Sequence, residues 1–250
     1  MKKCLDSNSI KLLAILAMTV DHITWAVFPG YPRELLPLLL RALGRITCPI
    51  MCYFIAEGYH HTKNIRKYTG RLFLFALISH FAYIYSSTAY RGWQSFIPFA
   101  DGYLLNQTSV MWSLAWGLVM LRVANSQRIQ KEWIRTGLIL LICLIALPSD
   151  WSCIASLCIL VFGTNRWRFK LQMLWMLFYV AIYALVYCLA LDPVYGLLQM
   201  AVVLAIPILQ LYNGQRGKHR GFNRFMKWLF YLYYPLHLFV IGWVLHGVKK

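Results

Sequence analysis

Long apolar runs, separated by short stretches of charged and turn-forming residues, follow one another along almost the whole chain. A helix needs about 20 residues to cross ~30 Å of hydrocarbon, and most of these runs approach that length. The pattern predicts nine helical segments, at residues 10–28, 35–59, 68–86, 104–124, 133–147, 151–163, 171–191, 194–211 and 225–248. The fifth and sixth segments are short and nearly contiguous, so they form either two crossings or one buried or re-entrant hairpin.

The composition changes the picture from a helical protein to a membrane protein. Hydrophobic residues make up 60% of the chain and charged residues only 13%, whereas soluble domains average about 25% charged residues. We therefore expect an all-α, polytopic transmembrane bundle that spans residues 1–250 as a single integral membrane domain, with the lipid bilayer as its surroundings.

The positive charge follows membrane topology. The formal net charge is +17, but a nucleic-acid-binding surface would gather its basic residues on one face, and here they fall in the loops, so we expect no nucleic-acid partner. With the N-terminus inside, 19 of the 25 Lys and Arg residues lie in inner segments and four in outer ones. This alternation predicts a multi-pass protein of the inner (cytoplasmic) membrane, with its N-terminus inside and its C-terminus outside.

Polar groups at membrane depth are the candidate functional residues. Asp21 and His22 interrupt the first apolar run, where a charged side chain costs roughly 2.5–3.5 kcal/mol on insertion scales. Arg41 and Arg45 are four residues apart on the second run, so they share one helical face at a similar depth. Asp21 either orients the His22 ring or neutralises the two arginines in a structural ion pair.

Further polar residues lie in other runs. His80 falls midway along the third run and either binds substrate or hydrogen-bonds a neighbouring helix. Asn106 stands at the start of the fourth run. His237 follows Tyr234-Pro235-Leu236 in the last run, where a proline interrupts helical hydrogen bonding.

The inner ends of the runs carry a second group of candidates. Near the end of the second run these are Glu57, His61, Thr62, Lys63 and Arg66, and after the eighth run they are Asn213 and Arg216. Loops of this kind suit an anionic cytosolic cofactor, although anchoring by positive charge at the inner membrane surface explains the basic residues equally well.

These residue types point to acyl transfer across the membrane. A histidine can take a proton from an amine or hydroxyl, or attack a thioester itself, while arginines stabilise an oxyanion or hold an anionic substrate. Metal ligation is poorly supported, because no H-x-x-x-H or H-x-x-E-H spacing occurs.

Several of these motifs together resemble the TraX family of integral membrane proteins. They are the first-run D-H at Asp21 and His22, R-x-x-x-R at Arg41 and Arg45, E-G-x-x-x-T from Glu57 to Thr62, Y-N-G-x-R-G from Tyr212 to Gly217, and Y-P-L-H from Tyr234 to His237. The family is named for a member that acetylates pilin N-termini, and it is similar to a wider superfamily of membrane acyltransferases.

The resemblance implies a specific activity for the predicted site. Acetyl-CoA would dock on the inner loops, and His22 would act as general base or acyl carrier beside Asp21. Arg41, Arg45, His80, Asn106 and His237 would bind the acceptor. The acceptor would be an extracytoplasmic peptide, glycan or lipid with an amine or hydroxyl. The rival hypothesis is a non-catalytic transporter or scaffold with a buried charge network, although the sequence shows no clear internal repeat of the kind many transporters have.

Overall fold

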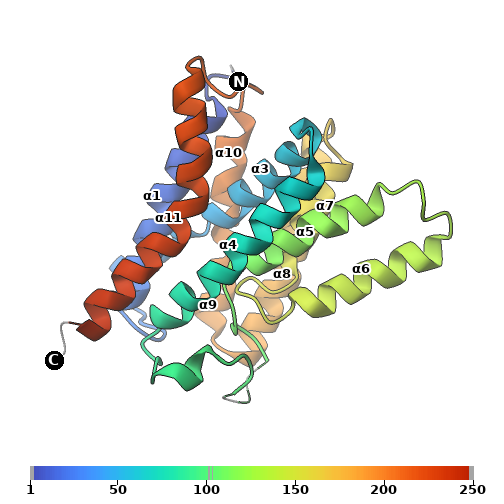
Figure 1. The fold of residues 1–250 in the computed structure, drawn as a ribbon. Coiled ribbons are helices and arrows are strands. Elements are labelled where there is room, and N and C mark those ends of the chain that lie inside the picture. The colour runs from blue at the N-terminus through green and yellow to red at the C-terminus, as the bar shows by residue number, and fades with distance from the viewer. Residues whose placement is uncertain (1–2, 101, 103, 248–250) are drawn as a thin grey trace. The chain divides into compact units, whose positions relative to one another are not determined.

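The computed structural model describes residues 3–100, 102 and 104–247 of the chain, and these residues form helices joined by short loops (Figure 1). No β-strand occurs within them, only two isolated bridges. The elements in chain order are α1 (Ser7–Val27), α2 (Leu35–Gly44), α3 (Thr47–His61), α4 (Ile65–Tyr85), η1 (Trp93–Phe96), α5 (Val110–Ala124), α6 (Glu132–Ala146), α7 (Ile154–Thr164), α8 (Phe169–Ala190), α9 (Pro193–Leu198), η2 (Gln199–Leu204), α10 (Ala205–Gln210) and α11 (Arg220–Gly247).

The predicted apolar segments are helical over most of their lengths, so the all-helical prediction is confirmed for the described residues. The predicted start of the fourth segment is wrong, because residues 104–109 precede α5 and Ser109 is its N-cap. The predicted end of the last segment, Val248, lies outside the described residues.

Among the described residues, five helical stretches are long and apolar enough to cross a membrane: Ser7–Val27, Leu35–His61, Phe169–Ala190, Pro193–Gln210 and Arg220–Gly247. The helices α5 and α7 are apolar but have only 15 and 11 residues, which at 1.5 Å per residue span about 22 and 16 Å. The structure thus supports a helical membrane protein, while nine crossings and the inside N-terminus stay predictions.

Prolines account for the interruptions in two of these stretches. Pro49 has no N–H to donate to the carbonyl of Arg45, four residues earlier, and the second run breaks there between α2 and α3. Pro207 likewise cannot donate to Val203, and the preceding turns tighten into η2. The first break leaves Arg45 as the C-cap of α2.

The backbone forms two compact units. The first comprises residues 1–51, 86–88 and 180–250, and the second comprises residues 52–85 and 89–179. Within the first unit α1 packs against α2 and also against α11, beside which it runs in Figure 1. The helix α2 also contacts α9 and η2. Within the second unit α5 is central, because it contacts α4, α6 and α7. The first unit therefore brings together the runs that carry Asp21, Arg41 and His237.

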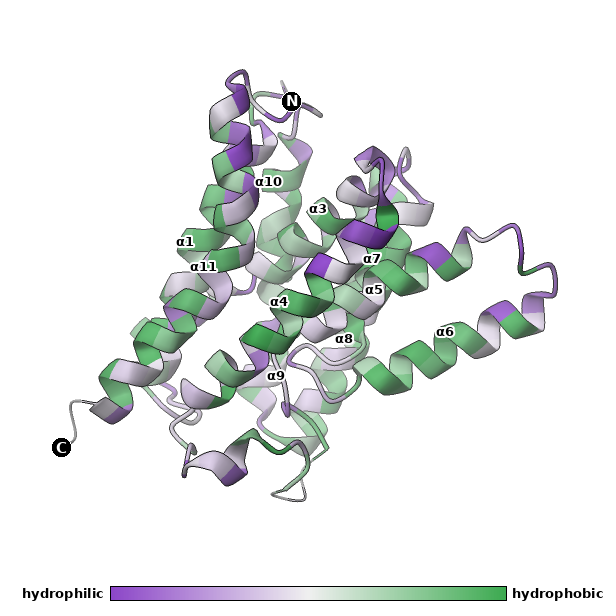
Figure 2. Cartoon of the chain, in the orientation of Figure 1, coloured by the Kyte–Doolittle hydropathy of each residue, from purple (hydrophilic) through white to green (hydrophobic). Residues whose placement is uncertain are grey.

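The helix surfaces are apolar where a soluble protein would be polar. Large hydrophobic side chains such as Leu16, Leu36, Leu144 and Leu189 are 59–80% exposed. Figure 2 shows hydrophobic positions along the helices, with hydrophilic positions gathered at the first turns of α11 and in the loops. Exposed apolar surface on this scale is stable when lipid covers it.

Candidate functional site

A buried charge cluster joins α1 to the end of α2. The carboxylate of Asp21 forms a hydrogen-bonded ion pair with Arg45, and its Oδ1 lies 3.7 Å from Nη1 of Arg41. The three side chains are only 14%, 11% and 8% exposed, respectively. Gly44 permits this approach, since a Cβ at that position would overlap the Asp21 side chain. The predicted pairing of Asp21 with both arginines is therefore present.

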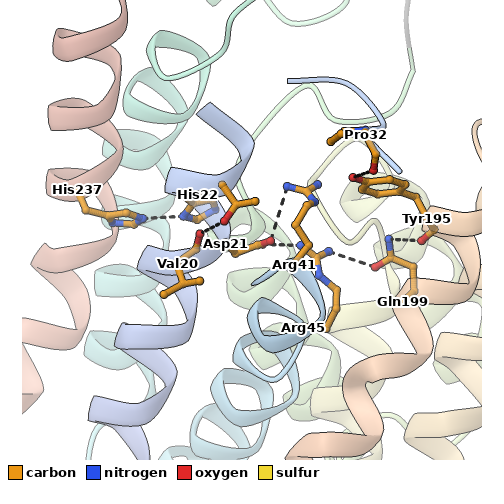
Figure 3. A network of polar contacts seen from close by, with 10 residues as sticks. Val20, Asp21, His22, Pro32, Arg41, Arg45, Tyr195, Gln199 and His237 are labelled. Carbon is orange, nitrogen blue, oxygen red and sulfur yellow. Dashed lines mark hydrogen bonds and ion pairs between the residues drawn. The ribbon is translucent and has the colours of Figure 1, made fainter. Parts of the chain in front are cut away.

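The two arginines differ in how they are held. Arg45 also donates through Nη1 to Oε1 of Gln199 at 3.1 Å, and Gln199 in turn donates to the backbone carbonyl of Tyr195 (Figure 3). The guanidinium of Arg41 instead lies over the ring of Trp25, at 4.7 Å from the ring centre, and 5.5 Å from that of Tyr195. Arg45 is thus fixed by hydrogen bonds and Arg41 mainly by aromatic faces.

A histidine pair joins α1 to α11 beside this cluster. Nδ1 of His22 lies 2.7 Å from Nε2 of His237, and the rings stack with their centres 4.9 Å apart. Nδ1 of His237 lies 2.7 Å from the backbone carbonyl of Tyr233. A carbonyl only accepts, so His237 carries its proton on Nδ1, and in the neutral ring its Nε2 accepts from Nδ1–H of His22. Among the described residues this assignment leaves the Nε2 lone pair of a neutral His22 without a hydrogen-bond donor.

Successive residues of a helix point about 100° apart, and that geometry separates the roles of the Asp21-His22 pair. Asp21 faces α2 and His22 faces α11, as Figure 3 shows. Within the described residues the Asp21 carboxylate bonds Arg45, while the His22 ring bonds His237. Of the two roles predicted for Asp21, its contacts show the ion pair, and the group bonded to the imidazole is another histidine.

His80 and Asn106 belong to the second unit. Nε2 of His80 donates to the backbone carbonyl of Phe96 at 2.9 Å, and its Nδ1 accepts from the Thr108 hydroxyl at 3.1 Å. Both ring nitrogens are therefore used in holding the segment between α4 and α5. Asn106 lies in that segment with a left-handed backbone (φ 58°) and is exposed. The contacts of His80 therefore hold this segment, and the left-handed backbone of Asn106 shapes its turn.

The inner candidates of the second unit meet at the end of α3. Glu57 pairs with His61 and with Nε of Arg166, each at 3.3 Å, and Nη2 of Arg166 lies 3.0 Å from Nε2 of His61. Lys63 and Arg66 are exposed in and after the turn that follows, next to Thr62. Arg166 was not among the predicted site residues, yet it pairs with the Glu57 carboxylate and compensates its charge. The positive charges of the neighbouring basic residues therefore stay available to an anion.

Asn213 and Arg216 lie in the first unit, in the loop that precedes α11. Oδ1 of Asn213 accepts from the N–H of Gln215 at 2.9 Å, and the N–H of Asn213 itself donates to the carbonyl of Leu5. Asn213 therefore shapes this loop and ties it to the chain before α1. The side chain of Arg216 is exposed and can therefore contact an anion from solution.

Two residues of the site were missed in the sequence analysis. Gln199 is a polar side chain inside an apolar run, which is a recognisable signal in the sequence, and it is only 3% exposed. Tyr195 was not among the candidates, and here its hydroxyl donates to the carbonyl of Pro32 at 2.9 Å and its ring faces Arg41. No cluster of three or more potential metal ligands occurs in the described part of the chain.

The fold and the site define a helical membrane protein with an ionisable centre enclosed by its first, second and last apolar helices. The family described as TraX protein matches residues 6–245, so the chain belongs to the TraX family and that prediction is confirmed. The curated "Probable fimbrial assembly protein FimC, serogroup H1" of Dichelobacter nodosus is 26% identical over 240 residues, covering 92% of this chain and 91% of the relative. No solved structure matches.

Proposed function

We propose that this TraX family member is an acyltransferase of the inner membrane that moves an acetyl group from cytosolic acetyl-CoA to an amine or hydroxyl at the outer face. The observation that carries the proposal is the part-buried pair of His22 and His237, in which one imidazole nitrogen of His22 has no hydrogen bond to a described residue and lies beside an excess of positive charge. A positioned base next to guanidinium groups is the arrangement that acyl transfer requires.

In the direct route, Nε2 of His22 takes the proton of the acceptor as its nitrogen or oxygen attacks the thioester carbonyl. The C–S bond then breaks, and the coenzyme A thiolate leaves with the proton that His22 returns. In the two-step route Nε2 itself attacks the thioester carbonyl, the C–S bond breaks, and the coenzyme A thiolate leaves. The acceptor then attacks the acetyl carbonyl, the bond from the acetyl group to Nε2 breaks, and the acceptor's proton passes to Nε2 and from there to the thiolate. In either route the excess positive charge of the adjacent arginine cluster would offset the charge that develops on the carbonyl oxygen.

Donor and acceptor would reach this centre from opposite sides. In the second unit the exposed basic residues Lys63 and Arg66, with Glu57, His61 and Thr62 beside them, suit the phosphates of acetyl-CoA. In the first unit the exposed Arg216, in the loop that Asn213 shapes, is a separate candidate for the same phosphates. The name of the relative, a fimbrial assembly protein, favours a peptide acceptor over a glycan or lipid. The proposed acceptor is accordingly a subunit of a surface fibre, modified on an amine.

The test uses membranes that contain the full chain, radiolabelled acetyl-CoA and intact-mass analysis of envelope peptides, glycans and lipids. Wild-type membranes are expected to add the mass of one acetyl group to an acceptor, and His22→Ala membranes are expected to lose this transfer while the variant remains inserted. His219→Ala is the matched control, because His219 is exposed and outside the pair. Transfer retained by His22→Ala would overturn the role of His22, and no acyl difference in any fraction would favour the transporter or scaffold.

A further inference from the structure

The charges around Asp21 do not balance. One carboxylate faces two guanidinium groups, all of them buried. The other described carboxylates of this unit lie elsewhere: Asp6 caps α1 at its opposite end, Asp192 caps α9, and Glu34 is exposed at the N-cap of α2. The cluster therefore carries one uncompensated positive charge.

The unmatched charge belongs to Arg41. Its closest approach to Asp21 is 3.7 Å, beyond hydrogen-bonding distance, and its Nε is buried without a hydrogen-bond partner in the described residues. The Nε atoms do not distinguish the two arginines, but Arg45 hydrogen-bonds both Asp21 and Gln199 through its other nitrogens, and Arg41 bonds neither. A buried charged donor without a partner is costly, and such groups inside membranes are retained chiefly for function. In Figure 3 the guanidinium of Arg41 lies between Asp21 and Tyr195, with the His22 ring on the other side of Asp21.

We propose that Arg41 is the binding site for a single carboxylate, or for the carboxylate-like oxyanion of the reaction, and that Arg45 is structural. The planar guanidinium matches a carboxylate with two parallel hydrogen bonds, and the rings of Trp25 and Tyr195 fix its plane. One excess charge suits a monoanion, whereas a polyphosphate would need several cations. The inference rests on the proposed function for the source of the anion but not for the existence of the site.

Two sources of this anion fit the proposed function. A carboxylate of the acceptor would bind Arg41 in the ground state and bring the acceptor to the site. The oxyanion formed when the acceptor attacks the thioester would bind it only in the transition state. Both are oxygen anions of one charge, and kinetics separate them.

The stability test compares two matched variants one turn apart, Arg41→Gln and Arg45→Gln, by thermal unfolding of the purified full chain in detergent. Arg41→Gln removes an unmatched charge, so its midpoint is expected to stay within about 2 °C of wild type. Arg45→Gln breaks a buried hydrogen-bonded ion pair, so its midpoint is expected to fall by ~6–12 °C. An equal loss in both variants would overturn the division of roles.

Sodium acetate is the binding probe, compared with sodium chloride at equal ionic strength. Acetate at ten times its dissociation constant is expected to raise the wild-type midpoint by ~3–6 °C. The increment should vanish in Arg41→Gln and persist in Arg33→Gln, a control whose side chain is 69% exposed. An acetate increment absent from wild type, or unchanged in Arg41→Gln, would overturn the site.

Transfer kinetics with Arg41→Lys then identify the source, because lysine keeps the charge but loses the planar pair of donors. A raised acceptor KM at constant kcat would identify the acceptor's carboxylate, and a lowered kcat at constant KM would identify the oxyanion. Unchanged kinetics would overturn the catalytic use of Arg41. If no transfer occurs in wild type, the proposed function fails, while the acetate measurement still decides whether Arg41 binds an anion.

Discussion

The substitution Asp21→Asn tests the buried ion pair most directly. It keeps the size of the side chain but removes the only carboxylate among the described residues that faces Arg41 and Arg45. Removing one partner of a buried ion pair costs about 3–5 kcal/mol, because the remaining charge stays buried without compensation. For a chain of this size each kcal/mol shifts the unfolding midpoint by roughly 2–4 °C, so we expect a decrease of ~6–20 °C.

Thermal unfolding of the full chain in detergent, followed by tryptophan fluorescence, measures this decrease. Glu132→Gln is the matched control, because Glu132 also pairs with an arginine, Arg135, but its side chain is 76% exposed. Exposed pairs contribute about 0–1 kcal/mol, so the control is expected to shift by at most a few degrees. Similar decreases in the unfolding midpoints of the two variants would refute the conclusion that the buried ion pair of Asp21 stabilises the fold.

Two further predictions address single groups. In nitrogen-15 spectra the proton of neutral His22 should lie on Nδ1 in wild type and in His237→Gln, since both offer an acceptor opposite Nδ1. In His237→Phe, which offers no acceptor, the proton should lie on Nε2. Identical spectra in all three proteins would refute the pairing. The N–H of Tyr195, and secondarily Arg33, hold the pKa of Asp192 below its ordinary value of 3.8. Its stabilising contribution is therefore complete above that value and lost as the pH falls through the lowered pKa, a loss that unfolding midpoints should show in wild type and not in Asp192→Asn.

Local signals in the sequence predicted the helices and one side of the site. A run of hydrophobic residues predicts a helix from residues that are close in sequence, and the helix predicted at residues 10–28 is α1, Ser7–Val27, with small errors at both ends. The four-residue spacing of Arg41 and Arg45 put both on the face that meets Asp21, the one acid at a matching depth. Pro49 marks the break after Arg45, although residues 35–59 were predicted as one continuous helix.

The other side of the site could not be read locally. His22 and His237 are 215 residues apart, and their hydrogen bond exists because α11 docks against α1. The structural role of His80 depends in the same way on the loop that brings Phe96 and Thr108 to its two nitrogens. Periodicity along one helix carries no information about which residue of another helix lies opposite.

The sequence by itself determined a helical membrane protein of the TraX family, with Asp21, His22, Arg41 and Arg45 as its polar centre, since charge inside an apolar run is costly wherever the chain folds. Only the tertiary structure decided how these residues divide their work. Helix packing places Asp21 in an ion pair with Arg45, His22 in a hydrogen bond with His237, and Gln199 in a hydrogen bond with Arg45. The physical reason is that insertion cost depends on residue type and depth, whereas a hydrogen bond depends on positions set by the packing of distant helices.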